Sequence, residues 1–296
     1  MEDFFLYVLI ALAGLAIADL VVGVSNDAVN FLNSAVGSKA ISFRSIMIVA
    51  SVGIAFGAIF SSGMMEVARK GIFNPELFYF DEIMFLFLAV MITDILLLDF
   101  FNTIGMPTST TVSIVFELLG AALAMSFIKI LNKGAELSTI VQYINNEKAI
   151  QIISGILLSV LIAFTVGALV QWITRVWMSF NFGNRSIFVS ASFGGIALAS
   201  ISNFILIKGI KGTAFADRAY AFTDGLSLTN YMEANTVLVL VAAFLFWFLL
   251  SLSLLLIKVN LYKFIIAAGT FSLALAFAGN DLVNFVGVPI AAYQSY

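Results

Sequence analysis

The chain has 296 residues, of which 62% are hydrophobic and only 10% are charged, and its formal net charge is −3. A soluble domain carries roughly 25% charged residues, so water is not the main solvent of this protein, and nothing in the charge points to a nucleic-acid partner. Neither cysteine nor histidine occurs, which excludes disulfides, thiolate nucleophiles, imidazole bases and ordinary zinc sites.

Apolar segments long enough to cross a bilayer, which takes about 20 residues, follow one another along the chain. We count about eight, at residues 4–24, 45–64, 83–101, 112–131, 150–172, 187–207, 236–257 and 262–278. The acidic start, Met1-Glu2-Asp3, differs from the basic beginning of a cleaved signal peptide, so we expect the first segment to be retained. The pattern predicts an all-α, multi-pass protein of the lipid bilayer.

Several acidic residues lie within or beside these apolar segments, where a charge at the bilayer centre costs at least about 2.5–3.5 kcal/mol. Each of them therefore needs a partner, a cavity or a proton. Asp94 and Asp99 either line a cavity or face a loop end, and Glu117 either binds a further cation or contacts a neighbouring hydroxyl. The full set is Asp19, Asp27, Asp94, Asp99, Glu117 and Asp281.

One motif occurs twice. Residues 25–31 read Ser-Asn-Asp-Ala-Val-Asn-Phe and residues 279–285 read Gly-Asn-Asp-Leu-Val-Asn-Phe, with five of seven positions identical. Both copies follow a long apolar segment. Repeated halves with interrupted helices are typical of secondary transporters, whose binding sites form near the membrane midplane where the repeats meet.

The residue types of this motif suit an ion site. Asn and Asp compete with the backbone for hydrogen bonds, which favours local unwinding and exposes backbone groups to a wet cavity. Asp27 and Asp281 would supply hard oxygen ligands for an alkali cation such as Na⁺, or would take a proton. Neutral oxygens would come from Asn26, Asn30, Asn280 and Asn284. The alternative is that the two copies recur by chance or only join helices.

A second motif, Thr-Ile-Gly-Met-Pro-Thr-Ser-Thr-Thr at residues 103–111, separates two apolar segments. Gly105 and Pro107 are expected to end one helix and to open the next. Ser109, Thr110 and Thr111 then fall in the first turn of that next helix, where free amides and the helix dipole favour an anion. These hydroxyls predict a cradle for a tetrahedral oxyanion, unless they only cap the helix and bond its carbonyls.

The two motifs are linked by electrostatics. An anion held close to Asp27 and Asp281 in a low-dielectric site would be repelled by several kcal/mol, because the apolar segments contain no lysine or arginine near their centres. Cations or protons must therefore accompany the anion. The sequence itself predicts coupled transport.

These residues resemble the inorganic phosphate transporter family, also called the phosphate permease family. Its signature is a duplicated Gly-Ala-Asn-Asp-x-x-Asn stretch, each copy followed by Gly-x-Pro-x-Ser-Thr-Thr. The resemblance implies an inverted repeat with broken or re-entrant helices, coupling cations near the two Asn-Asp motifs, and phosphate near Ser109, Thr110 and Thr111. Three positions depart from the family pattern: Ser25 and Gly279 replace alanine, and Val112 stands where histidine is frequent.

The chain ends at Tyr296, before a second Ser-Thr-Thr element. We expect either an N-terminal part of a longer protein, which we favour, or a site completed by a second chain, as in a homodimer. On this interpretation residues 1–131 form the first repeat, residues 132–235 are connecting helices and loops, and residues 236–296 begin a truncated second repeat.

The sequence thus predicts a secondary active transporter in the plasma (inner) membrane that carries inorganic phosphate with Na⁺ or H⁺, and predicts neither an enzyme nor a cofactor. Sulfate is the alternative substrate, because hydroxyls and amides do not distinguish it from phosphate. A cation exchanger would use the two aspartates without an anion cradle. An intramembrane aspartyl hydrolase needs two carboxylates sharing a proton, but its expected Gly-x-Gly-Asp and Tyr-Asp contexts are missing.

Overall fold

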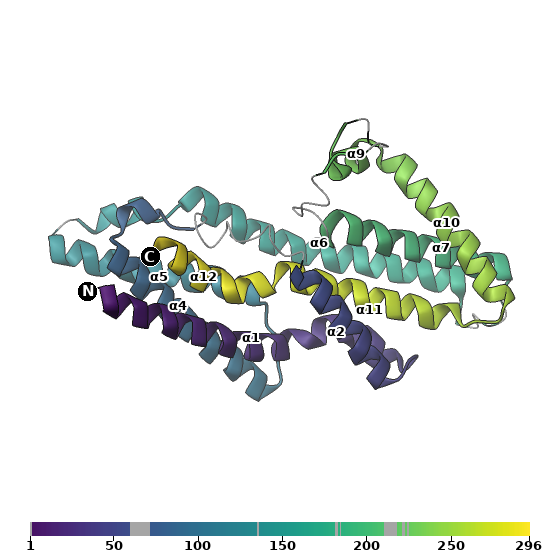
Figure 1. The fold of residues 1–296 in the computed structure, drawn as a ribbon, viewed down its shortest axis with the longest axis horizontal. Helices are drawn as coiled ribbons and strands as arrows, with labels where there is room; N and C mark the ends of the chain where they lie inside the picture. Colours follow the sequence, from purple (N-terminus) through teal and green to yellow (C-terminus); the bar gives the residue numbers. More distant parts are fainter. Residues whose placement is uncertain are drawn as a thin grey trace. The chain divides into compact units, whose positions relative to one another are not determined.

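The computed structural model describes residues 2–59, 72–134, 136–180, 183, 185–209, 218–220, 223 and 225–296, without the side chains of Glu2, Asp3, Lys208 and Asn280. Within this part the chain is almost entirely helical, with two isolated β-bridges (Figure 1). Seven helical spans there are long and apolar enough to cross a membrane. The predicted multi-pass helical fold is confirmed.

The helices match the predicted segments. The long ones are α1 (Glu2–Ser38), α4 (Phe80–Ile104), α5 (Thr110–Lys133), α6 (Asn146–Met178), α7 (Ile187–Phe204), α10 (Thr236–Leu256) and α11 (Leu261–Asn280), which is followed by α12 (Leu282–Ser295). The shorter ones are α2 (Phe43–Ile59), η1 (Pro75–Leu77), η2 (Leu137–Gln142), η4 (Ile205–Gly209) and α9 (Leu228–Ala234). The predicted segment 45–64 is represented by α2, and its last residues lie outside the described part.

The chain divides into two compact units, each built from stretches that are distant in sequence. Unit 1 contains residues 1–30, 64–159 and 280–296, and unit 2 contains residues 31–63 and 160–279. These limits differ from those of the predicted repeats, 1–131 and 236–296. The repeats were defined by the recurring sequence motif, whereas the units are defined by compactness. The division into repeats, and their inverted relation, stay predictions.

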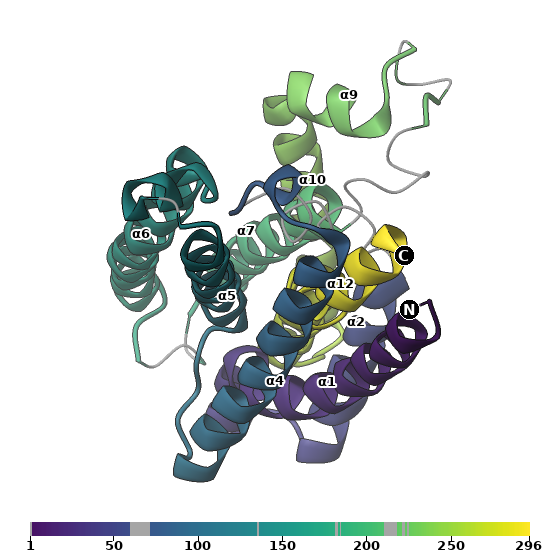
Figure 2. The ribbon, with the colours of Figure 1, turned by 90° about the vertical axis from the view of Figure 1, so that its left-hand side faces the viewer.

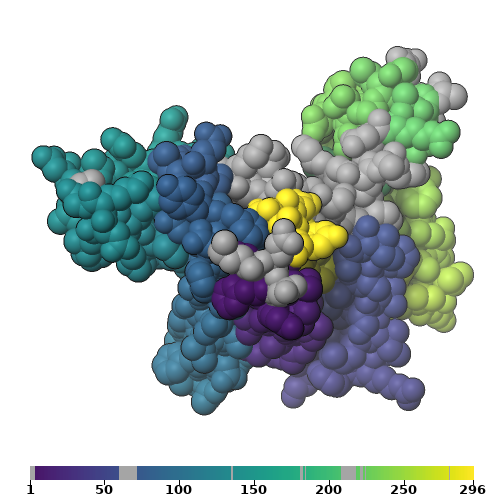
Figure 3. All heavy atoms as spheres, turned by 60° about the vertical axis from the view of Figure 1, so that its left-hand side comes forward, coloured from purple at the N-terminus to yellow at the C-terminus, as the bar shows by residue number. Residues whose placement is uncertain are grey.

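The core of unit 1 is apolar and lies between α1, α4, α5 and α12. Its buried residues recur at helical spacing, as do Met84, Phe87 and Met91 on α4, which places them on one face of the helix. At one end of the unit the ring of Phe80 lies 4.9 Å from that of Phe5 and 6.4 Å from that of Tyr296. The two ends of the chain therefore meet in unit 1, as Figures 2 and 3 show.

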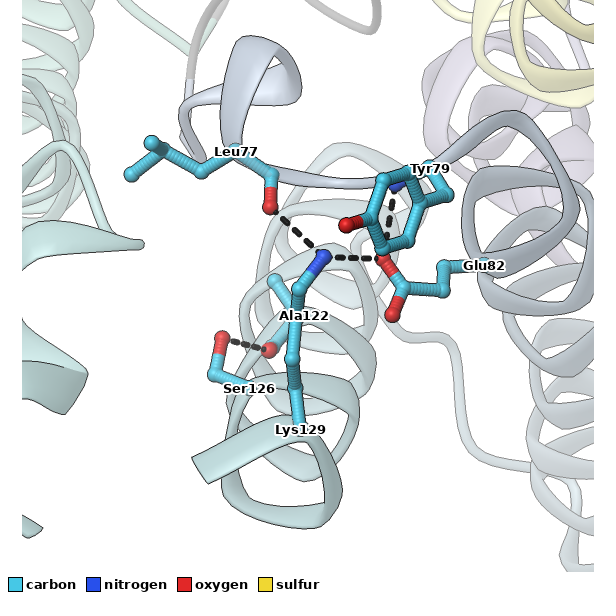
Figure 4. Close-up of polar contacts among 6 residues, drawn as sticks. All are labelled: Leu77, Tyr79, Glu82, Ala122, Ser126 and Lys129. Atoms are coloured by element: carbon cyan, nitrogen blue, oxygen red, sulfur yellow. Dashed lines mark hydrogen bonds and ion pairs between the residues drawn. The ribbon is translucent and has the colours of Figure 1, made fainter. Parts of the chain in front are cut away.

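A buried ion pair ties the beginning of α4 to α5 in the same unit (Figure 4). Lys129 is only 6% exposed and donates to a carboxylate oxygen of Glu82 at 2.5 Å and to the Leu77 carbonyl at 2.9 Å. Its ammonium group also lies 4.0 Å from the ring centre of Tyr79, whose backbone N–H donates to Glu82 at 2.7 Å. The charge at this depth is thus fully compensated, as buried charges must be.

Unit 2 depends on close contacts between helices. Its helices α7 and α10 pack along each other, and a Cβ added at Gly194 would come within 2.6 Å of the Ser251 hydroxyl. A Cβ at Gly53 of α2 would likewise come within 2.6 Å of the Phe271 carbonyl of α11. Such small residues let helix backbones approach each other, which is typical of membrane helix packing.

Candidate ion-binding site

The break between α4 and α5 forms as the sequence predicts. Helix α4 ends at Ile104, and Gly105 adopts the left-handed conformation, with a φ of 70°, that glycine accepts without strain. Helix α5 begins at Thr110 after Ser109, whose hydroxyl accepts a 3.4 Å hydrogen bond from the Val112 amide. The first amides of α5 have no partner within the helix and point toward the preceding loop.

The two Asn-Asp motifs differ in backbone structure. Helix α1 continues through Asn26 and Asp27, so the unwinding expected at the first copy is wrong. At the second copy the chain leaves α11 after Asn280 and begins α12 at Leu282, with Asp281 at the interruption. Glycine is a weaker helix former than serine, so Gly279 favours the interruption at the second copy, whereas Ser25 stands at the same place in the first copy.

Asn26 joins α1 to the loop between α4 and α5. Its amide nitrogen donates to the side-chain oxygen of Asn102 at 2.9 Å and to the Met106 carbonyl at 3.2 Å, and its oxygen accepts from the Thr108 amide at 2.7 Å. Asn102 in turn donates to the Val22 carbonyl at 2.9 Å. We call these bonds the asparagine bracket. Asn26 is 4% exposed and its amide is fully engaged, so it positions the loop.

The hydroxyls at the start of α5 contact both motif aspartates. Thr110 donates to Asp27 at 3.1 Å, and Thr111 donates to Asp281 at 3.0 Å. The Thr111 oxygen also accepts from the Asn284 amide at 2.9 Å. Two consecutive threonines therefore connect a carboxylate from α1 with one from the interruption before α12. We call this group of residues the threonine junction.

The remaining predicted residues are placed as follows. Asn30 donates to Asp27 at 3.1 Å, and Ser109 is an exposed helix cap. The side chain of Asn280 lies outside the described residues. Within the junction Asp27 and Thr110 are 3% and 2% exposed, whereas Thr111 is exposed. The junction thus has one buried side and one open side.

Asp94 and Glu117 both contact a different hydroxyl of α5, that of Ser113. The Ser113 hydroxyl is 2.8 Å from an oxygen of each. Asp19 is also fully buried and lies near the same two carboxyl groups. Asp99, five residues after Asp94, is exposed, so of the two alternatives drawn from the sequence Asp94 takes the interior and Asp99 does not.

A groove of about 620 Å³ opens beside these residues. Its polar lining includes Thr93, Thr108, Ser113 and Glu117. A water molecule occupies about 30 Å³ of liquid, so the groove has room for several. Ser109, Thr110 and Thr111 do not line it.

Asn102 and Ser113 belong to these polar contacts but were not predicted from the sequence. Asn102 lies in the last turn of α4, directly before the Gly105–Thr111 motif, and a polar residue there, beside a predicted helix break, was a usable signal. Ser113 had no such signal, because a lone serine in an apolar helix more often bonds its own backbone.

Comparison with known proteins identifies relatives. The model of the phosphate transporter family matches residues 23–296. A Helicobacter pylori protein named "Putative phosphate permease" is 36% identical over 111 residues, which make up 36% of this chain and 21% of that protein. A permease of the same description from Thermococcus kodakarensis is 29% identical over 123 residues, covering 40% and 30%. These matched segments thus span a fifth to a third of the relatives' length.

A solved structure, "The sodium-dependent phosphate transporter", has a similar fold. The two chains superpose with a TM-score of 0.70 and are 18% identical in sequence. The aligned part covers 97% of this chain and 68% of the solved chain. The resemblance inferred from the Asn-Asp and Ser-Thr-Thr motifs is confirmed. This chain belongs to the phosphate transporter family, a family of transporters and not of enzymes, and is a multi-pass protein of the plasma membrane.

Proposed function

We propose that this protein is a secondary active transporter that carries inorganic phosphate across the membrane together with Na⁺. Asp27, Asn30, Asn280, Asp281 and Asn284 serve the coupling cations, and Asn26 positions the loop before α5. Ser109, Thr110 and Thr111 serve phosphate.

The threonine junction is the observation that supports this proposal most strongly. The same hydroxyls that are suited to phosphate donate to Asp27 and Asp281 at 3.1 and 3.0 Å. A cation that neutralises the carboxylates weakens their hydrogen bonds to these hydroxyls, which then become available to the anion. The same cation removes the negative charge that would repel the anion. The carboxylates compete with the anion for one set of hydroxyls, and a bound cation ends this competition and attracts the anion. The anion therefore binds well only together with the cation, which is the requirement for coupling.

Sodium is favoured over a proton at this junction by the ligand set. Carboxylate and hydroxyl oxygens meet at the threonine junction, and hard cations prefer such oxygen ligands. The solved relative is described as sodium-dependent, which agrees with this choice.

The test is uptake of radiolabelled phosphate into proteoliposomes that contain the full-length protein, with Na⁺ and H⁺ gradients imposed separately. We expect uptake that follows the Na⁺ gradient and disappears in Asp27→Asn. The matched control is Asp99→Asn, an exposed carboxylate elsewhere in a span, which should transport normally.

The other outcomes separate the alternatives. Uptake driven only by the H⁺ gradient would replace Na⁺ by a proton as the coupling ion. Entry of sulfate but not phosphate would keep the carrier and change the substrate. Exchange of Na⁺ across the membrane without either anion, unaffected by Ser109→Ala, would identify a cation exchanger and overturn the proposal.

A further inference from the structure

Three carboxyl groups from three helices meet in unit 1 at a point that the proposed transport site does not use. Asp19 comes from α1, Asp94 from α4 and Glu117 from α5. Asp19 and Asp94 are fully buried and Ser113 is 7% exposed. The Ser113 hydroxyl oxygen lies 2.8 Å from an oxygen of Asp94 and 2.8 Å from an oxygen of Glu117.

These two distances conflict with two ionised carboxylates. A serine hydroxyl carries one hydrogen, so it donates to Asp94 or to Glu117 but not to both. If both were ionised, the second carboxylate would face a lone pair of the serine oxygen at hydrogen-bond distance. The contact becomes favourable when one carboxyl brings a proton of its own and donates it to Ser113.

The remaining oxygens also favour protonation of this cluster. Both oxygens of Asp19, one of Asp94 and one of Glu117 are buried and have no hydrogen-bond partner. A buried carboxylate without a donor is so unfavourable that the group takes up a proton instead. The charged groups that face Asp19 from the neighbouring helices are Asp94 and Glu117, and Asp94 also faces Asp27, so the electrostatic surroundings are entirely acidic.

A metal ion fits this place less well than protons do. Among the described residues no three acidic side chains converge in an arrangement that holds a metal ion. The buried cation of unit 1 that lies on α5, Lys129, is paired with Glu82. Protons, in contrast, fit the contacts of Ser113: Glu117 donates to Ser113, and Ser113 donates to Asp94. A proton on Asp19 can be shared with the free oxygen of Asp94.

We propose that Asp19, Asp94, Ser113 and Glu117 form a proton-holding site that carries two protons at neutral pH and is separate from the Asn-Asp site. Asp19 precedes Asp27 by eight residues on the continuous helix α1, a separation of about 12 Å along its axis. Glu117 and Ser113 line the groove of about 620 Å³, so one end of the chain of hydrogen bonds lies at an opening. The buried end is Asp19.

The test is infrared spectroscopy of the purified full-length protein at neutral pH in saturating Na⁺, comparing water with deuterium oxide. We expect a band from protonated carboxylic acids that shifts in deuterium oxide and loses about half its intensity in Asp19→Asn or in Glu117→Gln. These amides mimic protonated acids as donors, so both variants should fold. Asp99→Asn is the matched control and should leave the band unchanged.

Three results would overturn the proposal. One is a wild-type protein without a protonated-acid band at neutral pH. Another is a band that disappears in Asp27→Asn but survives in both Asp19→Asn and Glu117→Gln, since the protons would then belong to the Asn-Asp site. The third is an Asp27→Asn protein whose band is present without Na⁺ and disappears when Na⁺ is added, since the carboxyl cluster would then bind the metal ion.

A second measurement does not depend on the band assignment. Because the folded chain would hold protons that the unfolded chain has released at neutral pH, raising the pH must lower the thermal midpoint of the wild type. The double variant Asp19→Asn/Glu117→Gln should lose less of its midpoint over the same pH range, and an equal loss would contradict the proposal. Phosphate uptake is a separate readout, so failure of transport with the band intact refutes only the proposed function.

Discussion

Asp27 and Asp281, near opposite ends of the chain, accept hydrogen bonds from two neighbouring threonines of α5. The side chain of Thr110 therefore contacts α1, and that of Thr111 contacts the interruption before α12. A ligand that changes one of these bonds changes the surroundings of both carboxylates. We therefore expect substitutions at the start of α5 to change ion binding while the protein still folds.

Replacing Thr110 by valine should weaken coupling. The substitution keeps the shape of the side chain and removes the hydroxyl, and a hydrogen bond to a charged group is worth about 1.5–3 kcal/mol. We therefore expect the Na⁺ concentration for half-maximal phosphate uptake to rise by about tenfold or more. Thr110→Ser keeps the hydroxyl and should stay close to the wild type.

The matched control is Thr165→Val, since the Thr165 hydroxyl bonds only carbonyls of its own helix, α6. A Thr110→Val protein with unchanged Na⁺ dependence would show that the threonine junction plays no part in coupling.

Loss of the asparagine bracket should destabilise the protein. Asn26→Ala leaves the Thr108 amide and the Asn102 oxygen without their partner, and each unsatisfied buried group costs about 1–3 kcal/mol. We expect a lower thermal midpoint in detergent, whereas Ser25→Ala, which removes an exposed bond within α1, should have little effect.

The same variant distinguishes two roles for Asn26. If Asn26→Ala unfolds at the wild-type temperature but shifts the Na⁺ dependence of uptake, the residue is a cation ligand, as first predicted from the sequence, and not a positioning residue.

Gly23 on α1 lies against the ring of Phe285 on α12, which is fully buried. A Cβ at position 23 would overlap this ring, so Gly23→Ala should destabilise the protein by about 1–3 kcal/mol, the usual range for overpacking. Phe285→Leu in the same chain should relieve part of the loss. Thermal unfolding of the four proteins of this double-mutant cycle measures the interaction, and additive effects would contradict the contact.

The pair of Lys129 and Glu82 predicts an asymmetry. Glu82→Gln leaves a buried ammonium group without its counter-charge, and breaking a buried pair in this way costs about 3–5 kcal/mol. The double variant Glu82→Gln/Lys129→Met removes both charges and should be more stable than Glu82→Gln alone. The measurement is the thermal midpoint of each variant. A double variant that unfolds at a lower temperature than Glu82→Gln would show that the charge of Lys129 itself is required.

Features determined by neighbouring residues were predictable. Gly105 ends a helix through its left-handed conformation and Ser109 caps the next, and both properties belong to the residue itself. The apolar segments were equally visible, because spanning a bilayer demands length and composition that few other helices have. The full length of α1 was not predictable, because the part of the helix that follows Val24 contains many polar residues.

Features that depend on distant partners were not predictable. Nothing near Asn26 in the sequence indicates that Asn102 and Thr108 will engage its amide and leave α1 intact. Likewise the contact between Asp94 and Glu117 through Ser113 requires α4 and α5 to pack at one particular rotation. Sequence patterns specify which face of a helix is buried, but not which polar atoms then meet.

The length of α1 has a consequence for the bilayer around it. A helix of 37 residues is about 55 Å long at 1.5 Å per residue, whereas the hydrocarbon core is about 30 Å thick. Helix α1 must therefore tilt steeply, or extend beyond the hydrocarbon by about 25 Å in total, or locally thicken the lipid. Membrane thickness then becomes a variable of this protein, and reconstitution in lipids of different acyl-chain length would alter the depth at which its aspartates lie.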